Sequence, residues 1–199
     1  MRPAVAQAYG VLTGRDFRSH HPDDPDWVKT RIDEALARDG SLSLVGFWGV
    51  GERGSANGVE TQALDNLSNL VSQLPVPARL TLILAEEHGR LNGKDGQKVA
   101  DYLAGIAALA DERRFESVHQ SLLWSKWGLR EPFGTLSDSE WVQNPLARTL
   151  EARSQKHYRG DLSARQDAQR YYLMCLAERS LIALDFPLAI WWSYSSPEF

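Results

Sequence analysis

Apolar positions along the chain alternate between short continuous runs and stretches of helical spacing. The runs at 42–48 and 80–85 have the length and composition of buried strands, and a third strand is predicted over 118–124. Between them, apolar residues recur every three or four positions over about 59–74 and 99–110, which predicts amphipathic helices. Strands that alternate with helices in this way favour a parallel sheet with right-handed crossovers.

Capping signals define the helix before the first strand. Asp24 followed by Pro25 predicts a helix start, and Gly40 predicts its end. Residues 1–23 show no clear period.

The last third of the chain is predicted to be mostly helical. One helix is expected from Trp141 to about 158, with an interruption near Pro145. A long helix begins after the cap at Ser163 and runs through Ala183, and 188–192 forms a final strand. Because no repeat, low-complexity segment or linker divides the chain, the sequence predicts a single α/β domain over 1–199. We expect a Rossmann-like, mostly parallel sheet with helices on both faces.

Composition and the lack of long apolar runs indicate the type of cellular compartment that the protein occupies. The chain has 199 residues, a net charge of −4 and one cysteine, Cys175, so no internal disulfide or cysteine-based metal cluster is expected. The first residues lack the apolar core of a signal peptide, and no apolar run is long enough to span a bilayer. We therefore expect a cytoplasmic protein with no membrane association. The sequence names no cofactor and does not define the oligomeric state.

The first candidate segment follows the strand at 42–48. Glycines between 49 and 58 allow a ligand to approach the backbone closely, and the next helix would present free N–H groups to an anion. The spacing matches neither the dinucleotide fingerprint nor the P-loop. A plain turn explains the segment equally well. The candidate substrate-binding residues here are Trp48, Gly49, Gly51 and Glu52.

The second candidate segment follows the strand at 80–85. Glu86 and Glu87 supply carboxylates that can bind a ribose hydroxyl, and His88 can act as an acid, a base or a single metal ligand. Asn92 lies just beyond them. No second histidine stands at ligand spacing, so no metal site is predicted. The alternative is a solvated polar turn.

The third candidate is Glu178, a carboxylate on an otherwise apolar helix face. Such a group is costly to bury unless it is paired or functional. It is predicted to act as an acid or base, with Tyr172 and Tyr194 assisting and Tyr171 contributing to substrate binding. The alternative is a buried salt bridge to Arg170 or Arg179.

A basic segment lies between Arg148 and Arg170. It contains six basic and three acidic residues in a chain that is acidic overall. Arg148, Arg153, Lys156 and Arg159 are candidate RNA-binding residues, because cations that share a helix face can track a phosphate backbone. A solvated helix surface is the alternative.

Two stretches of the C-terminal third, YYLMCLAE at 171–178 and LIALDFPLAI at 181–190, resemble cyclodipeptide synthases. The resemblance implies a fold similar to the catalytic domain of class I aminoacyl-tRNA synthetases. It also implies that aminoacyl-tRNA binds through a basic helix. Two positions depart from the family pattern. Met174 occupies the place of the family's tyrosine, one turn before Glu178. The family's nucleophilic serine after the first strand has no counterpart, since Ser55 is the nearest hydroxyl, so an acyl-enzyme is not supported.

The leading hypothesis is a biosynthetic transferase that acts on an amino-acid-like, aminoacyl or nucleotide-bearing substrate, with tRNA as a candidate partner. The substrate would bind between the glycine loop, Glu86–His88 and Glu178. Two alternatives remain. One is a non-catalytic RNA-binding module that uses the basic segment 148–170. The other is a small-molecule methyl- or nucleotidyltransferase.

Overall fold

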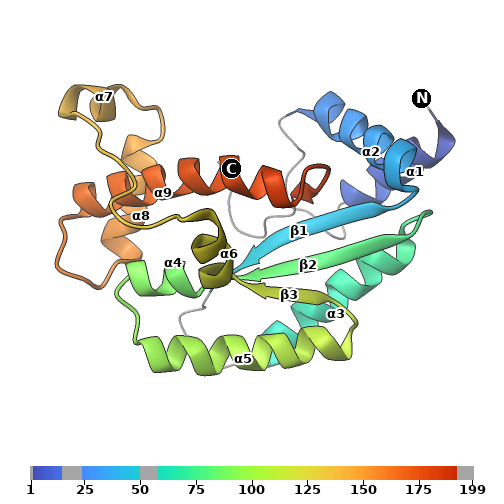
Figure 1. Cartoon of the computed structure of the whole chain (residues 1–199), viewed down its shortest axis with the longest axis horizontal. Coiled ribbons are helices and arrows are strands. Elements are labelled where there is room, and N and C mark those ends of the chain that lie inside the picture. The colour runs from blue at the N-terminus through green and yellow to red at the C-terminus, as the bar shows by residue number, and fades with distance from the viewer. Residues whose placement is uncertain (1, 15–23, 50–57, 192–199) are drawn as a thin grey trace.

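The computed structural model describes residues 2–14, 24–49 and 58–191. Its sheet is parallel and has the strand order β3-β2-β1-β4 (Figure 1). The long central pair aligns Leu44 of β1 with Leu80 of β2, and β4 pairs with β1 through Ile190. The strands are β1 (Leu42–Trp48), β2 (Ala78–Leu84), β3 (Glu116–His119) and β4 (Ile190–Trp191). The α/β class and the parallel sheet predicted from the sequence are thus confirmed.

Helices account for most of the remaining described residues. They are α1 (Pro3–Leu12), α2 (Pro25–Asp39), α3 (Gly58–Gln73), α4 (Glu86–Leu91), α5 (Gly96–Glu112), α6 (Gln120–Trp127), α7 (Asp138–Gln143), α8 (Ala147–His157) and α9 (Ala164–Asp185). The predicted ends of α2 are confirmed. The Asp24 carboxylate accepts a hydrogen bond from the backbone N–H of Trp27, and Gly40 adopts a left-handed conformation. The break between α7 and α8 and the capping box at Ser163 are also confirmed.

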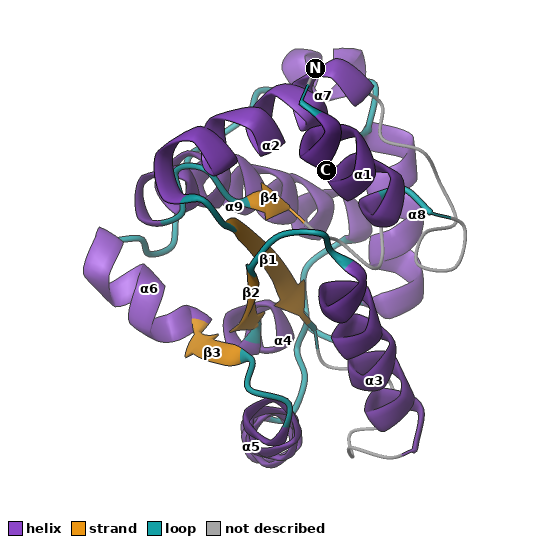
Figure 2. Ribbon diagram, turned by 90° about the vertical axis from the view of Figure 1, so that its right-hand side faces the viewer, coloured by secondary structure: helices purple, strands orange, loops and turns teal. Residues whose placement is uncertain are grey.

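The two faces of the sheet are covered by different helices. Leu44 and Leu82 point into a core built with α1, α2, α3 and the end of α5. Val45 and Ile83 point the other way and pack against α6 and α9. Figure 2 shows the sheet at the centre of the molecule, with α6 and α3 on opposite sides of it. Period-two alternation in the strands therefore separates two apolar layers.

The third predicted strand exists as β3, but its predicted bounds of 118–124 are wrong. β3 ends at His119, and the next residue begins α6. In this helix Leu123 and Trp124 are buried while Leu122 is 63% exposed, which is the pattern of a helix that packs on one side. A short apolar run does not distinguish a strand from a buried helix segment. α1, within the segment 1–23 that showed no period, was not predicted either.

The carboxyl ends of β1, β2 and β3 point toward α4 and α6 (Figure 1). α8 packs against α9 through a small cluster around Trp141, Leu150 and Ala168. The Ser154 hydroxyl donates a 2.6 Å hydrogen bond to Asp167 across the same interface. No helix in the described segments is long and apolar enough to cross a membrane.

Candidate functional site

Four side chains from three helices meet beyond the carboxyl ends of β2 and β3. We call His88, Gln120, Trp124 and Glu178 the strand-end cluster. His88 lies on α4, which begins directly after β2, and Gln120 begins α6 directly after β3. Trp124 follows one turn later on α6, and Glu178 projects from α9. Parallel strands bring the first two helix starts together because all the strands end at the same edge of the sheet.

Glu178 is the centre of this cluster and is only 2% exposed. Its Oε1 accepts a 2.6 Å hydrogen bond from the indole N–H of Trp124 and another from the side-chain amide of Gln120. Its Oε2 lies 2.9 Å from Nε2 of His88. A buried carboxylate is tolerated only when its oxygens are hydrogen-bonded, and both oxygens have partners here.

Gln120 connects Glu178 to the backbone of α4. Its side chain is fully buried, and its Oε1 accepts a 3.2 Å hydrogen bond from the backbone N–H of His88. The other end of the amide faces Glu178. One side chain thus contacts both the main chain of His88 and the carboxylate that holds the imidazole.

Glu86 provides the reciprocal connection. Its carboxylate accepts hydrogen bonds from the backbone N–H of Gln120, at 3.3 Å, and from that of Ser121, at 2.9 Å. These are free donors at the start of α6, which an anion at a helix N-terminus satisfies. Glu86 therefore caps α6 while Gln120 caps α4, and the two helix starts are locked together.

Aromatic rings enclose the imidazole of His88. Phe47, from the end of β1, stacks on it with ring centroids 5.1 Å apart. Tyr171 of α9 meets it edge-on at 6.0 Å. The His88 side chain keeps 16% exposure. It is the most accessible titratable member of the cluster.

Tyr171 and its neighbour Cys175 remain protonated at neutral pH. Burial raises the pKa of Tyr171, and the neighbouring Cys175 and Glu178 raise it further. The charge of Arg153 acts on Tyr171 in the opposite direction. Burial also raises the pKa of Cys175 to about 12. A thiol with so high a pKa is not a nucleophile at neutral pH, which agrees with a packing role.

The structure brings His88, Glu178 and Tyr171 together but places other predicted residues elsewhere. Trp48 lies on the opposite face of the sheet from Phe47, and its indole N–H donates to the Tyr102 hydroxyl at 3.1 Å. Tyr172 packs against Trp141 in the cluster that joins α8 to α9.

The remaining residues of the second candidate segment have structural contacts. Glu87 pairs with Arg90 at 2.7 Å. The Asn92 carbonyl accepts a 3.1 Å hydrogen bond from the backbone N–H of Arg159. Glu86 to Leu91 form the helix α4 and not a polar turn.

The other candidate residues belong to the first and third segments. Gly49 follows β1 directly, whereas Gly51, Glu52 and Tyr194 lie outside the described residues.

The salt-bridge interpretation of Glu178 is wrong as to its partner. Arg170 pairs with Asp167 at 2.7 Å, and Arg179 is exposed. The partner is His88, together with Gln120 and Trp124, which the sequence analysis missed. The spacing of Gln120 and Trp124 could have indicated them, because residues four positions apart share one face of a helix. This relation was not recognised because the segment was interpreted as a strand.

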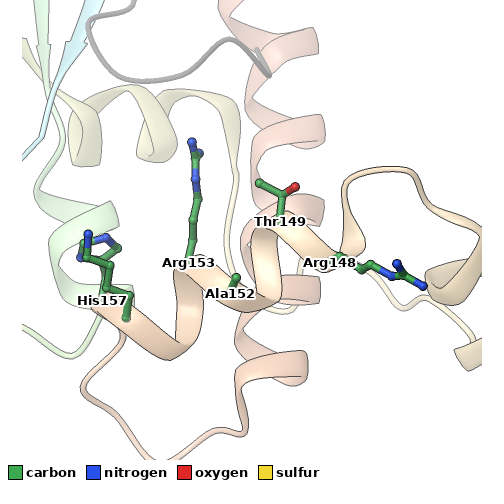
Figure 3. A pocket seen from close by; sticks show the side chains of 6 residues that line it. Arg148, Thr149, Ala152, Arg153 and His157 are labelled. Atoms are coloured by element: carbon green, nitrogen blue, oxygen red, sulfur yellow. The ribbon is translucent and has the colours of Figure 1, made fainter.

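A second candidate region lies on α8. A surface hollow of about 670 Å³ lies along this helix. Figure 3 shows side chains that line it, with Arg153 and Thr149 extending from the helix in the same direction. The short side chains of Thr149 and Ala152 leave room between the cations. The described lining residues, none of them acidic, are Arg148, Thr149, Ala152, Arg153, Lys156 and His157. Arg159 lies just beyond, and its guanidinium donates to the Tyr158 carbonyl.

Within the described residues, no three histidine, cysteine or acidic side chains form a group that could hold a metal ion. No protein-family model, curated protein or solved structure matches the chain. The geometry of the two candidate regions is therefore the basis for assigning a function.

Proposed function

We propose that the chain is a transferase-type enzyme in which His88 exchanges protons with substrate at the carboxyl ends of the strands. The observation that carries this proposal is the 2.9 Å contact between Nε2 of His88 and the buried carboxylate of Glu178. A histidine whose one nitrogen is held by a carboxylate is oriented for general acid–base catalysis through the other nitrogen.

The arrangement of the sheet supports the finer description of the fold as Rossmann-like. All four strands are parallel, and the chain adds β2 and β3 on one side of β1 but β4 on the other. The change of side at β1 is the switch point at which such sheets bind ligands. Phe47 at the end of β1 stacks on His88. The proposed acid–base group is therefore next to the position where this architecture favours a substrate.

Glu178 takes a different role from the one expected from sequence. With 2% exposure and hydrogen-bond contacts to three side chains, it is a positioning residue that orients His88. His88 would remove a proton from the hydroxyl or amine of an acceptor as that group attacks a carbonyl or phosphoryl centre. It would then return the proton to the departing oxygen.

The surroundings favour an amino-acid-like, aminoacyl or nucleotide-bearing substrate. Phe47 and Tyr171 offer flat apolar surfaces beside His88, which suit a side chain or a base. Arg153 lies within electrostatic reach of Tyr171 and extends from α8, as Figure 3 shows. A substrate with a reactive end at His88 and an anionic part along α8 would contact both regions, and an aminoacyl-tRNA has this form.

The test is an aminoacyl-transfer assay with total tRNA charged with a mixture of labelled amino acids. The purified protein should release label from the tRNA into small products faster than the uncatalysed reaction. His88→Gln, whose side-chain amide can still donate to Glu178, should remove this activity while leaving the melting temperature near that of the wild type. His119→Asn is the matched control, since the His119 side chain is 51% exposed and lies 3.4 Å from Glu86, with no hydrogen bond or ion pair to Glu178 or His88 among the described residues. Loss of label equal to the protein-free rate would contradict the proposal.

A second candidate function, a non-catalytic RNA-binding module, is favoured by the hollow on α8. It requires only the cations that line the hollow and no chemistry at His88. Binding of uncharged tRNA with no transfer activity would support it over the enzyme. The methyl- or nucleotidyltransferase alternative relied on Glu86 or Glu87 for a ribose. Glu86 caps α6 and Glu87 pairs with Arg90, so these contacts favour the first two candidates.

A further inference from the structure

Hydrogen-bond polarity around Glu178 determines where the proton of His88 resides. The backbone N–H of His88 can only donate, so the Gln120 atom that faces it must be the carbonyl Oε1. The Nε2 amide of Gln120 therefore faces Glu178 and donates to it. The reversed amide would place N–H against N–H and oxygen against oxygen.

Oε1 of Glu178 is consequently an obligate acceptor. It receives the amide of Gln120 and the indole N–H of Trp124, which can only donate. Any proton between the two groups must therefore lie in the 2.9 Å contact between Oε2 of Glu178 and Nε2 of His88. The two donors on Oε1 stabilise Glu178 as a carboxylate, which can only accept, so this proton belongs to His88.

We infer that Gln120 and Trp124 are positioning residues that hold the proton of neutral His88 on Nε2, so that Nδ1 is the nitrogen that exchanges protons with substrate. Among the described residues no hydrogen bond to Nδ1 is formed. The fixed tautomer follows from the contacts alone, and only the catalytic use of Nδ1 rests on the proposed function.

A single substitution should reverse the tautomer. In Glu178→Gln, the side-chain oxygen has two obligate donors to satisfy, Gln120 and Trp124. The new amide nitrogen must then face His88 and donate to Nε2. The imidazole proton would move to Nδ1, and the nitrogen that faces the substrate would lose its lone pair for proton abstraction.

The experiment is a long-range ¹H–¹⁵N NMR spectrum of the full chain with ¹⁵N-labelled histidine, recorded at a pH at which the imidazoles are neutral. The chain has five histidines, so the His88 signals are assigned by their loss in His88→Asn. The wild type should show the Nε2-protonated tautomer. Glu178→Gln should show the Nδ1-protonated tautomer, with the other four histidines unchanged.

Gln120→Met tests the glutamine itself, because methionine fills a similar volume without polar atoms. We expect a mixture of His88 tautomers, whereas the control Gln143→Met, on the exposed surface of α7, should keep the wild-type spectrum. A single Nε2-protonated form in Gln120→Met would remove Gln120 from the inference. If that variant fails to fold, the other two spectra still decide.

A wild-type His88 that is protonated on Nδ1, or a tautomer unchanged in Glu178→Gln, would overturn the inference. These spectra need no substrate. The expected tautomers combined with no transfer activity would therefore refute the proposed enzyme while leaving the tautomer assignment intact.

Discussion

The strand-end cluster and the hollow on α8 are both polar, but they are built in opposite ways. In the cluster, buried groups from α4, α6 and α9 have defined partners, and Glu178 alone has hydrogen-bond contacts to three side chains. On α8, Arg148 and Lys156 are exposed cations on one short helix. The first region depends on geometry and the second on charge.

The difference in construction indicates that the cluster can fix the position of protons and side chains, whereas α8 can attract a charged partner. Hydrogen bonds in a buried, low-dielectric site are strong and directional, so they fix tautomers and positions, and they cost stability when broken. Exposed cations act over a distance, are screened by salt and contribute little to folding. A substitution that leaves a buried donor or acceptor of the cluster without a partner should therefore lower the free energy of unfolding, and a substitution on α8 should change binding.

The largest expected effect is that of Glu178→Leu. It leaves the Gln120 amide and the Trp124 indole N–H buried without an acceptor, which should lower the free energy of unfolding by about 3 kcal/mol. Urea denaturation measures this change. Glu178→Gln, which keeps an oxygen for both donors, should retain most of the stability.

The matched control for Glu178→Leu is Glu112→Leu on α5, whose side chain is 68% exposed and pairs weakly with Arg113. Its effect should stay within about 0.5 kcal/mol. Equal losses of unfolding free energy in the two variants would mean that Glu178 stabilises the fold no more than a surface carboxylate does.

An intermediate effect is expected for Asp185→Asn, at the edge where α6 meets α9. Lys126 bonds to the Asp185 carboxylate and lowers its pKa, and Trp127 donates to the same group at 2.8 Å. Because the pKa is lower in the folded protein, the contact stabilises above the pKa of an unfolded aspartate, near 4. The stabilisation is lost as the pH falls through the folded pKa.

The substitution should therefore cost less than about 1 kcal/mol at pH 7 and nothing at a pH below both pKa values. Thermal unfolding of the wild type and Asp185→Asn across the acid range measures this. Lys126→Met should show the same loss at pH 7. A cost that persists undiminished in acid would assign the effect to packing and not to charge.

The smallest effect on folding is expected for the paired change of Arg148→Glu with Lys156→Glu. Stability should stay within about 0.5 kcal/mol of the wild type. Binding of tRNA, measured by filter retention across salt concentrations, should weaken, with a salt dependence reduced by roughly two phosphate contacts.

Arg38→Glu with Lys98→Glu makes the same change in net charge on α2 and α5, away from the hollow. This pair should bind tRNA nearly as the wild type does. If both pairs weaken binding equally, overall charge is responsible and the hollow on α8 is not a specific site.

Local patterns were sufficient for most of the secondary structure. The strand at 42–48 and the helix stripe of Val99, Tyr102 and Ile106 were predictable because a buried face imposes its period on the sequence. The failure at 118–124 had a larger consequence. Misassigning the start of α6 as a strand concealed Gln120 and Trp124, since their side chains share a face only in a helix.

The sequence by itself determined that Glu178 lies on an apolar helix face and that His88 follows a strand. That these two residues form a pair was decided only by the tertiary structure. They are 90 positions apart, and their contact requires a parallel sheet that brings α4 and α6 to the same edge. It also requires α9 to pack over that edge. Amphipathic period is a property of neighbours along the chain, whereas a buried hydrogen bond between distant segments depends on strand order and helix packing.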